Sequence, residues 1–266
     1  VLVADVLPET HPEWFESAPA GLFRAFLHAH LRQSARFLCI SGATEQGLRE
    51  VARSIGETRE LDCVVTPLGA DFARTDDPLP LPTDLFGLRY LLDVSTFEPR
   101  KNHALLLDAF DSVQARYPDL ALVLVGKVGW RTDAVVERVL HHPLLNRRLF
   151  WFDRADDELL ATLYRHAFVA VTPSFSEGFG FPVIEALAHG VPTLSSNGGA
   201  LPEAGGDLVE YFDPTDLDAL IRLIERHLFD ERWNQQQRRR LDGYRVPTWD
   251  DSAAAVLAAI EPLISR

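Results

Sequence analysis

Short apolar runs alternate with amphipathic stretches along most of the chain. From Gly87 onward the apolar runs predict strands at 89–95, 120–126, 149–152, 168–172, 192–195 and 209–212. The stretches between them have helical periodicity and predict helices near 102–116, 131–140, 157–166, 181–189, 199–204 and 214–228, followed by two more near 231–242 and 249–264. Strands that alternate with helices in this way are typical of right-handed βαβ crossovers. The pattern therefore predicts an α/β fold with a doubly wound parallel sheet.

The first 70 residues show a shorter version of the same alternation. The pattern predicts a strand at 1–4, a proline-rich aromatic loop at 7–15, a helix at about 21–35, a strand at 37–41, a helix at about 44–54 and a strand at 63–65. A proline-rich stretch from Asp76 to Asp84 follows, and proline favours an extended, semi-rigid connection. We therefore expect two α/β units joined by a linker.

The composition is that of a globular protein with an acidic surface. Of the 266 residues, 47% are hydrophobic, and 39 acidic against 26 basic residues give a formal net charge of -13. This charge argues against nucleic acid as the main partner, because phosphate backbones bind to basic surfaces. The run from Arg238 to Arg240 is better explained as a solvated helix face. No stretch reaches the roughly 20 apolar residues that a membrane span requires.

The cysteines and histidines do not indicate a metal site. Cys39 and Cys63 each lie in an apolar run, as buried thiols of a reducing compartment do. His28 and His30 are two residues apart, so they do not share a helix face. There is also no Asp-x-Asp motif with an apolar flank, and no Gly-x-Ser-x-Gly elbow of a Ser-His-Asp hydrolase. We expect neither a metal nor a cofactor.

The most informative stretch runs from Ser174 to Pro192. An apolar run precedes it, its glycines predict a turn, and a helix follows. At the carboxyl end of a parallel strand such a turn lies where ligands bind, and the helix directs free backbone N–H groups towards anions. Glu177 on the turn and Glu185 about two helical turns later suit a polyhydroxylated ligand, because carboxylates accept hydrogen bonds from hydroxyl groups.

The filled motif resembles that of a known enzyme family. The spacing Glu-x7-Glu, with Gly-Phe-Gly-x-Pro inside it and Ala-x-x-x-Gly-x-Pro after it, resembles the signature of the retaining, nucleotide-sugar-dependent glycosyltransferases of family 4, of the group 1 type. Residues 95–102, Ser-Thr-Phe-Glu-Pro-Arg-Lys-Asn, are similar to the phosphate-binding turn of that family. The resemblance implies the GT-B architecture, in which a Rossmann-like donor domain faces a Rossmann-like acceptor domain.

The resemblance also assigns roles to residues at matching positions. Glu177 would lie near the donor sugar, while Arg100 and Lys101 would stabilise the diphosphate as its negative charge develops. These three are the expected catalytic residues. The expected donor-binding residues are Thr96, Gly126, Lys127, Arg154, Ser174, Gly178, Phe179, Gly180 and Glu185, with Glu185 on the ribose hydroxyls.

Simpler explanations compete with some of these roles. The dipole of a helix N-terminus stabilises acidic residues such as Glu177 without any ligand. A glycine such as Gly126 is expected at the end of any strand of this kind. Arg100 and Lys101 could be a solvated pair, but cations at a helix start oppose the dipole, which indicates an anion nearby.

The resemblance divides the chain into four parts. Residues 1–75 would be the end of an acceptor-side domain, 76–86 a linker, 87–245 the donor-binding domain and 246–266 a helix that braces the first domain. Because the chain starts at Val1 inside an expected strand and contains no methionine, we expect a fragment whose acceptor-side domain lacks its opening strands and helices.

The predicted function is transfer of a mannose-like or glucose-like hexose from a nucleoside diphosphate sugar to a saccharide or lipid-linked acceptor with retention, in bacterial surface polysaccharide synthesis. We expect it in the cytoplasm, with peripheral contact at the inner face of the membrane compatible with such an acceptor. Two departures from the family favour a non-catalytic nucleotide-sugar-binding or regulatory relative: Ala4 replaces a frequent histidine and Thr96 a frequent arginine. A nucleotide-sugar epimerase of the same fold is the third alternative.

Overall fold

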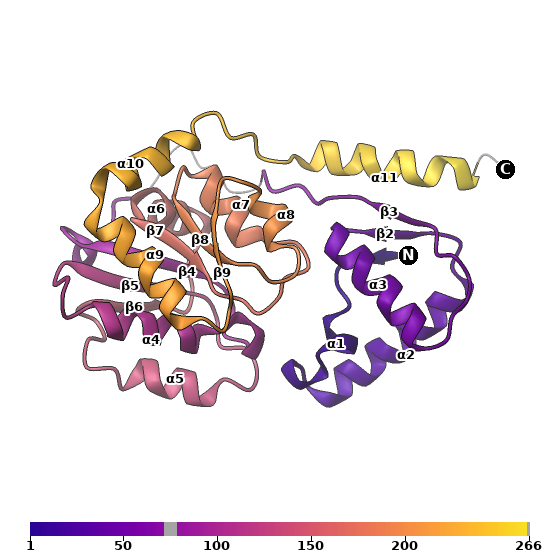
Figure 1. Ribbon diagram of the computed structural model, residues 1–266, viewed down its shortest axis with the longest axis horizontal. Helices are drawn as coiled ribbons and strands as arrows, with labels where there is room; N and C mark the ends of the chain where they lie inside the picture. Colours follow the sequence, from indigo (N-terminus) through magenta and orange to yellow (C-terminus); the bar gives the residue numbers. More distant parts are fainter. Residues whose placement is uncertain (72–78, 265–266) are drawn as a thin grey trace.

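The computed structural model describes residues 1–71 and 79–264, which form a larger and a smaller lobe (Figure 1). The strands are β1 (Leu2–Val3), β2 (Phe37–Cys39), β3 (Cys63–Val65), β4 (Arg89–Val94), β5 (Leu120–Val125), β6 (Leu149–Phe152), β7 (Val169–Thr172), β8 (Thr193–Ser196) and β9 (Glu210–Phe212). The α-helices are α1 (Leu7–Thr10), α2 (Ser17–Gln33), α3 (Gly42–Ser54), α4 (His103–Val113), α5 (Asp133–Leu140), α6 (Asp157–His166), α7 (Phe181–Ala188), α8 (Leu201–Gly205), α9 (Leu217–Phe229), α10 (Glu231–Arg240) and α11 (Trp249–Ile264). The 3-10 helices are η1 (Pro12–Trp14), η2 (Thr83–Leu85) and η3 (Pro99–Lys101).

Two parallel sheets organise the two lobes. The smaller sheet has the strand order β1-β2-β3, and the larger has the order β6-β5-β4-β7-β8-β9. In the larger sheet the chain starts in the middle at β4, moves outward through β5 and β6, and returns to the other side of β4 with β7. The strand order therefore reverses between β4 and β7. In sheets of this kind ligands bind at such a reversal, beyond the carboxyl ends of the strands.

Neighbouring residues of the central strand pack on opposite faces of the larger sheet. Leu91 belongs to a core with α4 and α9, whereas Tyr90 and Leu92 belong to a core with α6 and α7. Both faces are covered by helices, as the nearly continuous apolar sequence of β4 and β5 requires. The predicted doubly wound parallel sheet is confirmed, and its strands and helices lie within three residues of their predicted bounds.

The smaller lobe has a separate core, and it differs from the prediction at one end. The expected loop at 7–15 contains α1 and η1, because the Val6 carbonyl accepts hydrogen bonds from the N–H groups of Glu9 and Thr10, and Leu7 is buried. Helix α2 begins at Ser17 instead of Gly21, so it gains one turn in which Ala20 is buried. The proline-rich pattern masked this helical turn.

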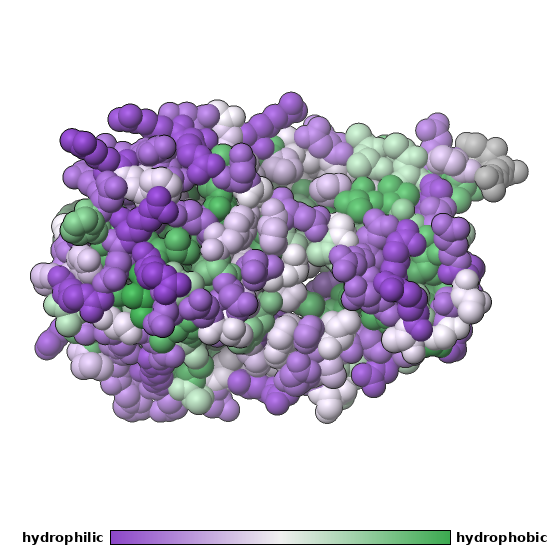
Figure 2. Space-filling view, viewed as in Figure 1, coloured by the Kyte–Doolittle hydropathy of each residue, from purple (hydrophilic) through white to green (hydrophobic). Residues whose placement is uncertain are grey.

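The C-terminal segment leaves the larger lobe and runs along the smaller one as α11 (Figure 1). The N–H of Trp249 donates to Asp71 Oδ1 at 2.9 Å, and Arg36 Nη1 donates to the Ala259 carbonyl. Figure 2 shows a mainly hydrophilic face on which hydrophobic residues gather around α11. We propose on these contacts that α11 braces the smaller lobe.

Part of the expected linker at 76–86, residues 76–78, lies outside the described residues. In the remainder, η2 packs on the larger lobe through the buried Leu85. Among the described residues, no helix has both the length and the apolar character needed to cross a membrane.

The brace can be tested at a glycine that touches it. A Cβ on Gly69 would lie 2.3 Å from the Trp249 nitrogen, so Gly69→Ala should separate α11 from the smaller lobe and lower the free energy of unfolding by about 1–3 kcal/mol. Thermal unfolding and the rate of tryptic cleavage at Arg245 measure this. Gly21→Ala is the control, since a Cβ there meets nothing within 4 Å and alanine favours a helix. Unchanged stability and cleavage in Gly69→Ala would contradict the proposed contact.

Candidate functional site

Two loops meet where the strand order of the larger sheet reverses. One follows β4 and contains residues 95–102, and the other follows β7 and contains residues 173–180. The N–H of Phe175 donates to the Arg100 carbonyl at 2.7 Å, and Asn102 Nδ2 donates to the Pro173 carbonyl at 3.2 Å. These contacts place the predicted phosphate-binding turn directly against the predicted glycine turn.

Asn102 makes this arrangement possible. Its φ of 57° is left-handed, a conformation that asparagine tolerates better than most residues, and it ends η3 and begins α4. Arg100 and Lys101 lie on η3, and Asn102 separates this turn from α4. Besides Pro173, the Asn102 amide binds the Pro214 carbonyl at 2.8 Å. The sequence motif contained Asn102, but the pattern gave no sign that its side chain ties two loops together.

The two turns bring Glu177 between the two cations. Lys101 Nζ lies 2.5 Å from Glu177 Oε1, and Arg100 Nη1 lies 2.6 Å from Glu177 Oε2. Ser174 Oγ donates to Oε1 at 2.8 Å. Lys101 and Glu177 are each only 8% exposed. Of the predicted site residues, the structure thus brings Arg100, Lys101, Ser174 and Glu177 into one buried cluster.

The electrostatics of Glu177 follow from this cluster. Burial alone would raise the pKa of its carboxyl, but the charges of Lys101 and Arg100 and the hydrogen bonds from Lys101 and Ser174 hold that pKa below its usual value of 4.5. Asp5, on the smaller lobe, lies close enough to feel Arg100 and Glu177, and burial raises its pKa. Glu98 also pairs with Arg100, with Oε2 at 2.9 Å from Nε. Lys101 and Arg100 are therefore paired with two carboxylates, Glu177 and Glu98, and Asp5 lies nearby.

The glycine turn is held by the smaller lobe. The Gly178 carbonyl accepts a hydrogen bond from Ser41 Oγ at 2.7 Å and lies 3.4 Å from Thr44 Oγ1. A Cβ on Gly178 would lie 2.5 Å from the Ala4 carbonyl oxygen, so the two lobes touch through backbone here. Gly180, with a φ of 99°, precedes α7, and Phe179 packs edge-on against Phe181.

Further contacts between the lobes surround this turn. The Glu203 carboxylate accepts hydrogen bonds from the N–H groups of Gly42 and Ala43 at 2.8 and 2.6 Å, where an acidic group also suits the N-terminal dipole of α3.

Aromatic residues also join the two lobes, between η1 of the smaller lobe and the loops after β5 and β7 of the larger lobe. Trp14 stacks on Phe175 at a ring distance of 5.9 Å, and Trp130 Nε1 donates to the Trp14 carbonyl at 2.7 Å. None of these residues was among the predicted site residues, because they meet only when the two lobes are placed together.

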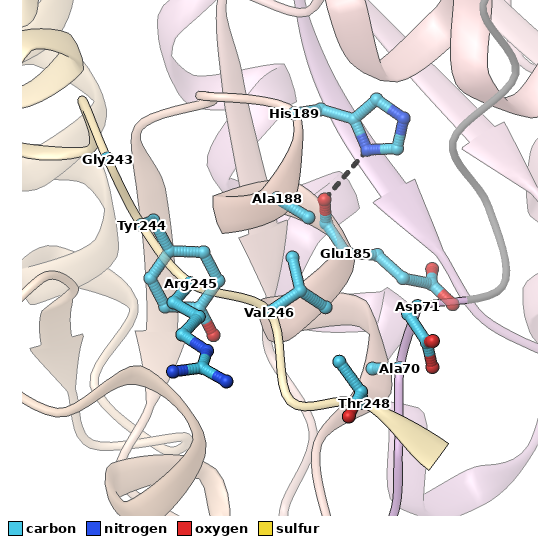
Figure 3. A pocket seen from close by; sticks show the side chains of 10 residues that line it. All are labelled: Ala70, Asp71, Glu185, Ala188, His189, Gly243, Tyr244, Arg245, Val246 and Thr248. Atoms are coloured by element: carbon cyan, nitrogen blue, oxygen red, sulfur yellow. Dashed lines mark hydrogen bonds between the residues drawn. The ribbon is translucent and has the colours of Figure 1, made fainter. Parts of the chain in front are cut away.

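Glu185 lies apart from this cluster. It accepts a hydrogen bond from the Tyr164 hydroxyl at 2.8 Å and lines a pocket of about 370 Å³ between the lobes. Asp71 and Thr248 line the same pocket, and Figure 3 shows Glu185 extending into it from α7. Burial raises the pKa of the Glu185 carboxyl, although the Tyr164 hydrogen bond opposes this shift. The two motif glutamates therefore have opposite pKa shifts.

The remaining predicted residues lie at the same edge of the larger sheet. Gly126, after β5, accepts a hydrogen bond from Trp151 Nε1 at 2.9 Å. Thr96 is half-buried beside Gly129, whereas Lys127 and Arg154 are exposed. Neither Lys127 nor Arg154 forms an ion pair within residues 1–71 and 79–264.

A serine, a histidine and an aspartate do meet in the structure, but not in the order of a hydrolase triad. His103 Nε2 lies 3.1 Å from Ser95 Oγ and 3.2 Å from Asp93 Oδ2, so both groups share one ring nitrogen. In a triad the aspartate binds the other nitrogen. Ser95 Oγ also donates to Asp93, and His103 stacks on Phe97. This network supports the loop after β4. Among the described residues, no three His, Cys, Asp or Glu side chains form a potential metal site.

Comparison with known proteins identifies the family. The model of the family "Glycosyl transferases group 1" matches residues 87–244. The chain belongs to this family. It is 30% identical over 278 aligned residues to the serotype-specific mannosyltransferase WbdA of Escherichia coli, covering 99% of this chain and 33% of that protein. It is 38% identical over 150 residues to the O-antigen chain mannosyltransferase B of Escherichia coli, covering 55% of this chain and 38% of the relative. The chain thus spans about a third of the length of these relatives.

Solved structures show the same fold. This group 1 chain matches sucrose-phosphate synthase from Thermosynechococcus elongatus with a TM-score of 0.65 and 24% identity, covering 89% of this chain and 60% of the other. It matches trehalose 6-phosphate synthase from Burkholderia multivorans with a TM-score of 0.66 and 16% identity, covering 93% and 62%. At these identities the likeness is one of fold. The predicted GT-B architecture is confirmed.

The buried ion pair gives a pH-dependent prediction. A carboxyl with a lowered folded-state pKa stabilises the protein above its unfolded pKa, here about 4.5, and this stabilisation is lost as the pH falls through the folded value. Lys101→Met should therefore lower the free energy of unfolding by about 3 kcal/mol at pH 7.5, and the difference from the parent should shrink below about pH 4.5. Urea unfolding at several pH values measures this.

Lys127→Met removes an exposed lysine and should change stability by less than about 0.5 kcal/mol. If the free energies of unfolding of Lys101→Met and the parent differ by the same amount at pH 7.5 and at pH 3.5, the stabilising ion pair between Lys101 and Glu177 is refuted.

Proposed function

We propose that the chain forms the donor site and part of the cleft of a retaining glycosyltransferase of family 4. The enzyme would move a hexose from a nucleoside diphosphate sugar to a saccharide or lipid-linked acceptor. The main support is a pair of cations, the buried Lys101 and the partly buried Arg100, at the reversal of the larger sheet in a group 1 chain. This is where phosphates bind in sheets of this kind. The Glu-x7-Glu spacing from Glu177 to Glu185 supports the family assignment.

Each part of the donor has residues of fitting chemistry. The diphosphate would bind Lys101, Arg100 and the backbone of Gly178 to Gly180 at the start of α7. Glu177 would orient the sugar, since it lies at the turn that the smaller lobe also touches. Glu185 would bind the ribose hydroxyls. Thr96, Gly126, Lys127, Arg154 and Phe179 would complete the donor site around these groups, and Ser174 would act by holding the Glu177 carboxylate.

The chemistry would be mainly electrostatic. Departure of the diphosphate builds negative charge on its oxygens, and fixed cations in a buried site stabilise that charge without reorganisation. Lys101 and Arg100 are held in place by Glu177, Glu98 and the loop contacts of Asn102. We propose that these cations and the α7 N-terminus act in place of a metal ion.

The relatives' names guide the choice of sugar and pathway. WbdA and the O-antigen chain enzyme are both named as mannosyltransferases, and a further relative from Mycolicibacterium hassiacum, 29% identical over 238 residues, is named as an α-(1→4)-mannosyltransferase. We therefore propose mannose as the sugar and surface polysaccharide synthesis as the process. We propose that the transfer reaction takes place in the cytoplasm, at the inner face of the membrane.

One observation keeps a binding-only relative as a second candidate. Ala4, where the family often has a histidine, lies at the contact between the lobes, with its carbonyl 3.1 Å from Thr44 Oγ1 and close to Gly178. A sugar-contacting side chain would thus be missing next to the donor site. Donor turnover separates the candidates: a transferase requires an acceptor, an epimerase turns over donor without one, and a binding protein does neither.

Binding of nucleoside diphosphates and of pyrophosphate alone tests the roles proposed for Glu185 and Lys101. Glu185→Gln should weaken binding of GDP, UDP or ADP about tenfold and leave pyrophosphate binding unchanged, because only the ribose loses a partner. Lys101→Ala should weaken both, because the diphosphate loses a charge-assisted contact. Isothermal titration calorimetry measures both effects. Glu158→Gln, an exposed residue of α6, is the control for the loss of a carboxylate. Equal effects of the two variants on pyrophosphate would refute this division of roles.

A further inference from the structure

We propose that the donor diphosphate replaces the Glu177 carboxylate on Lys101 and Arg100, and that the released carboxylate turns to the donor sugar. This inference rests on the proposed function. It makes Glu177 a competitor of the diphosphate as well as a sugar ligand. Binding of the diphosphate and placement of the sugar-orienting group then become one event.

Glu177 occupies both cations at once. Each carboxylate oxygen has its own cation, with Lys101 Nζ at 2.5 Å and Arg100 Nη1 at 2.6 Å. Lys101 is 8% exposed, so solvent screens the pair little, and the interaction is stronger than at the surface. A diphosphate oxygen that approaches Lys101 must therefore replace an anion that is already bound to it.

The local charge makes simple addition of a diphosphate unfavourable. Lys101 and Arg100 are already paired with the carboxylates of Glu177 and Glu98, so the two cations have no unbalanced positive charge to offer. A diphosphate brings at least two further negative charges into a buried region, where like charges repel strongly. At least one carboxylate has to leave the cations before the diphosphate can use them.

Glu177 is the carboxylate whose departure frees the site. The Glu98 carboxylate pairs with Arg100 at Nε, and among the described residues it forms no ion pair with the Lys101 ammonium group. Asp5 is fixed by the N–H of Leu7, which donates to its Oδ1 at 3.0 Å. Glu177 is the residue that holds Lys101, and its own turn is the one that the proposed sugar would reach. Donor hydroxyl groups can replace the cations as its hydrogen-bond donors.

The exchange predicts that removing the Glu177 charge strengthens diphosphate binding. Glu177→Gln should bind GDP, UDP, ADP and pyrophosphate about tenfold more tightly than the parent, because the Glu177 carboxylate no longer competes for Lys101 and Arg100. The affinity of Glu177→Gln for a nucleotide sugar should increase less, since this ligand also loses the contact between its sugar and the Glu177 carboxylate. Titration calorimetry with each ligand measures both affinities.

Glu98→Gln is the matched control, because it removes one negative charge from the same cluster without freeing Lys101. We expect its diphosphate affinity to stay within about threefold of the parent. Equal tightening in the two variants would show a general charge effect and overturn the exchange. Unchanged or weaker diphosphate binding by Glu177→Gln would overturn it as well.

A milder variant covers the case in which Glu177→Gln does not fold. Ser174→Ala removes one of the hydrogen bonds that hold the carboxylate and should tighten diphosphate binding about twofold. Thermal unfolding checks that each variant is folded. If parent and variants all fold but none binds any nucleoside diphosphate, both the proposed function and the exchange are wrong. If the parent binds and neither variant binds more tightly, the exchange alone is wrong.

Discussion

The larger lobe depends on one buried interaction, in which Lys101 and Arg100 after β4 hold Glu177 after β7. Removing one partner of such a group leaves an uncompensated buried charge, which is strongly destabilising. Asn102 reinforces the same junction through backbone carbonyls of two other segments. Electrostatics and hydrogen bonding therefore fix the same pair of loops at the reversal of the sheet. The groups proposed to bind a diphosphate are thus also the groups that hold this part of the fold together.

The hydrogen bonds that the smaller lobe makes to the Gly178 turn come from neutral side chains. Ser41 binds the Gly178 carbonyl, and Glu203 of the larger lobe binds the N-terminus of α3 in return. The turn between Glu177 and α7 is therefore held from both lobes. A relative movement of the lobes would break the contacts of Gly178 and Glu203 together. The position of the smaller lobe and the geometry of the proposed sugar-binding turn are consequently coupled.

Local pattern predicted the elements of the larger lobe because its central strands are buried on both faces and its helices are amphipathic. The two sequence motifs named Arg100, Lys101, Ser174 and Glu177, which do meet at the reversal, but also Glu185, which lies apart from them. The contacts of Ser41 and Glu203 could not be predicted, since they join residues about 140–160 positions apart and depend on how the lobes meet. The same is true of the Trp14–Phe175 stack. For Asn102, the side-chain amide binds carbonyls of two other segments, which no local pattern reveals.

The two motif glutamates show how one helix start can carry two different carboxylates. Burial acts to raise the pKa of both carboxyls. Lys101 and Arg100 reverse this effect at Glu177, so its pKa is lowered, whereas Glu185 has only the neutral Tyr164 hydroxyl and its pKa stays raised. The cations therefore favour the ionised form of Glu177, and in the proposed exchange its position would depend on what else those cations bind. Glu185 forms no ion pair among the described residues, and Lys101 acts on its pKa only at longer range. The spacing between them thus separates a carboxylate that is paired with two cations from one that is bound to a neutral hydroxyl, and in the proposed function the first would respond to the diphosphate and the second to the ribose.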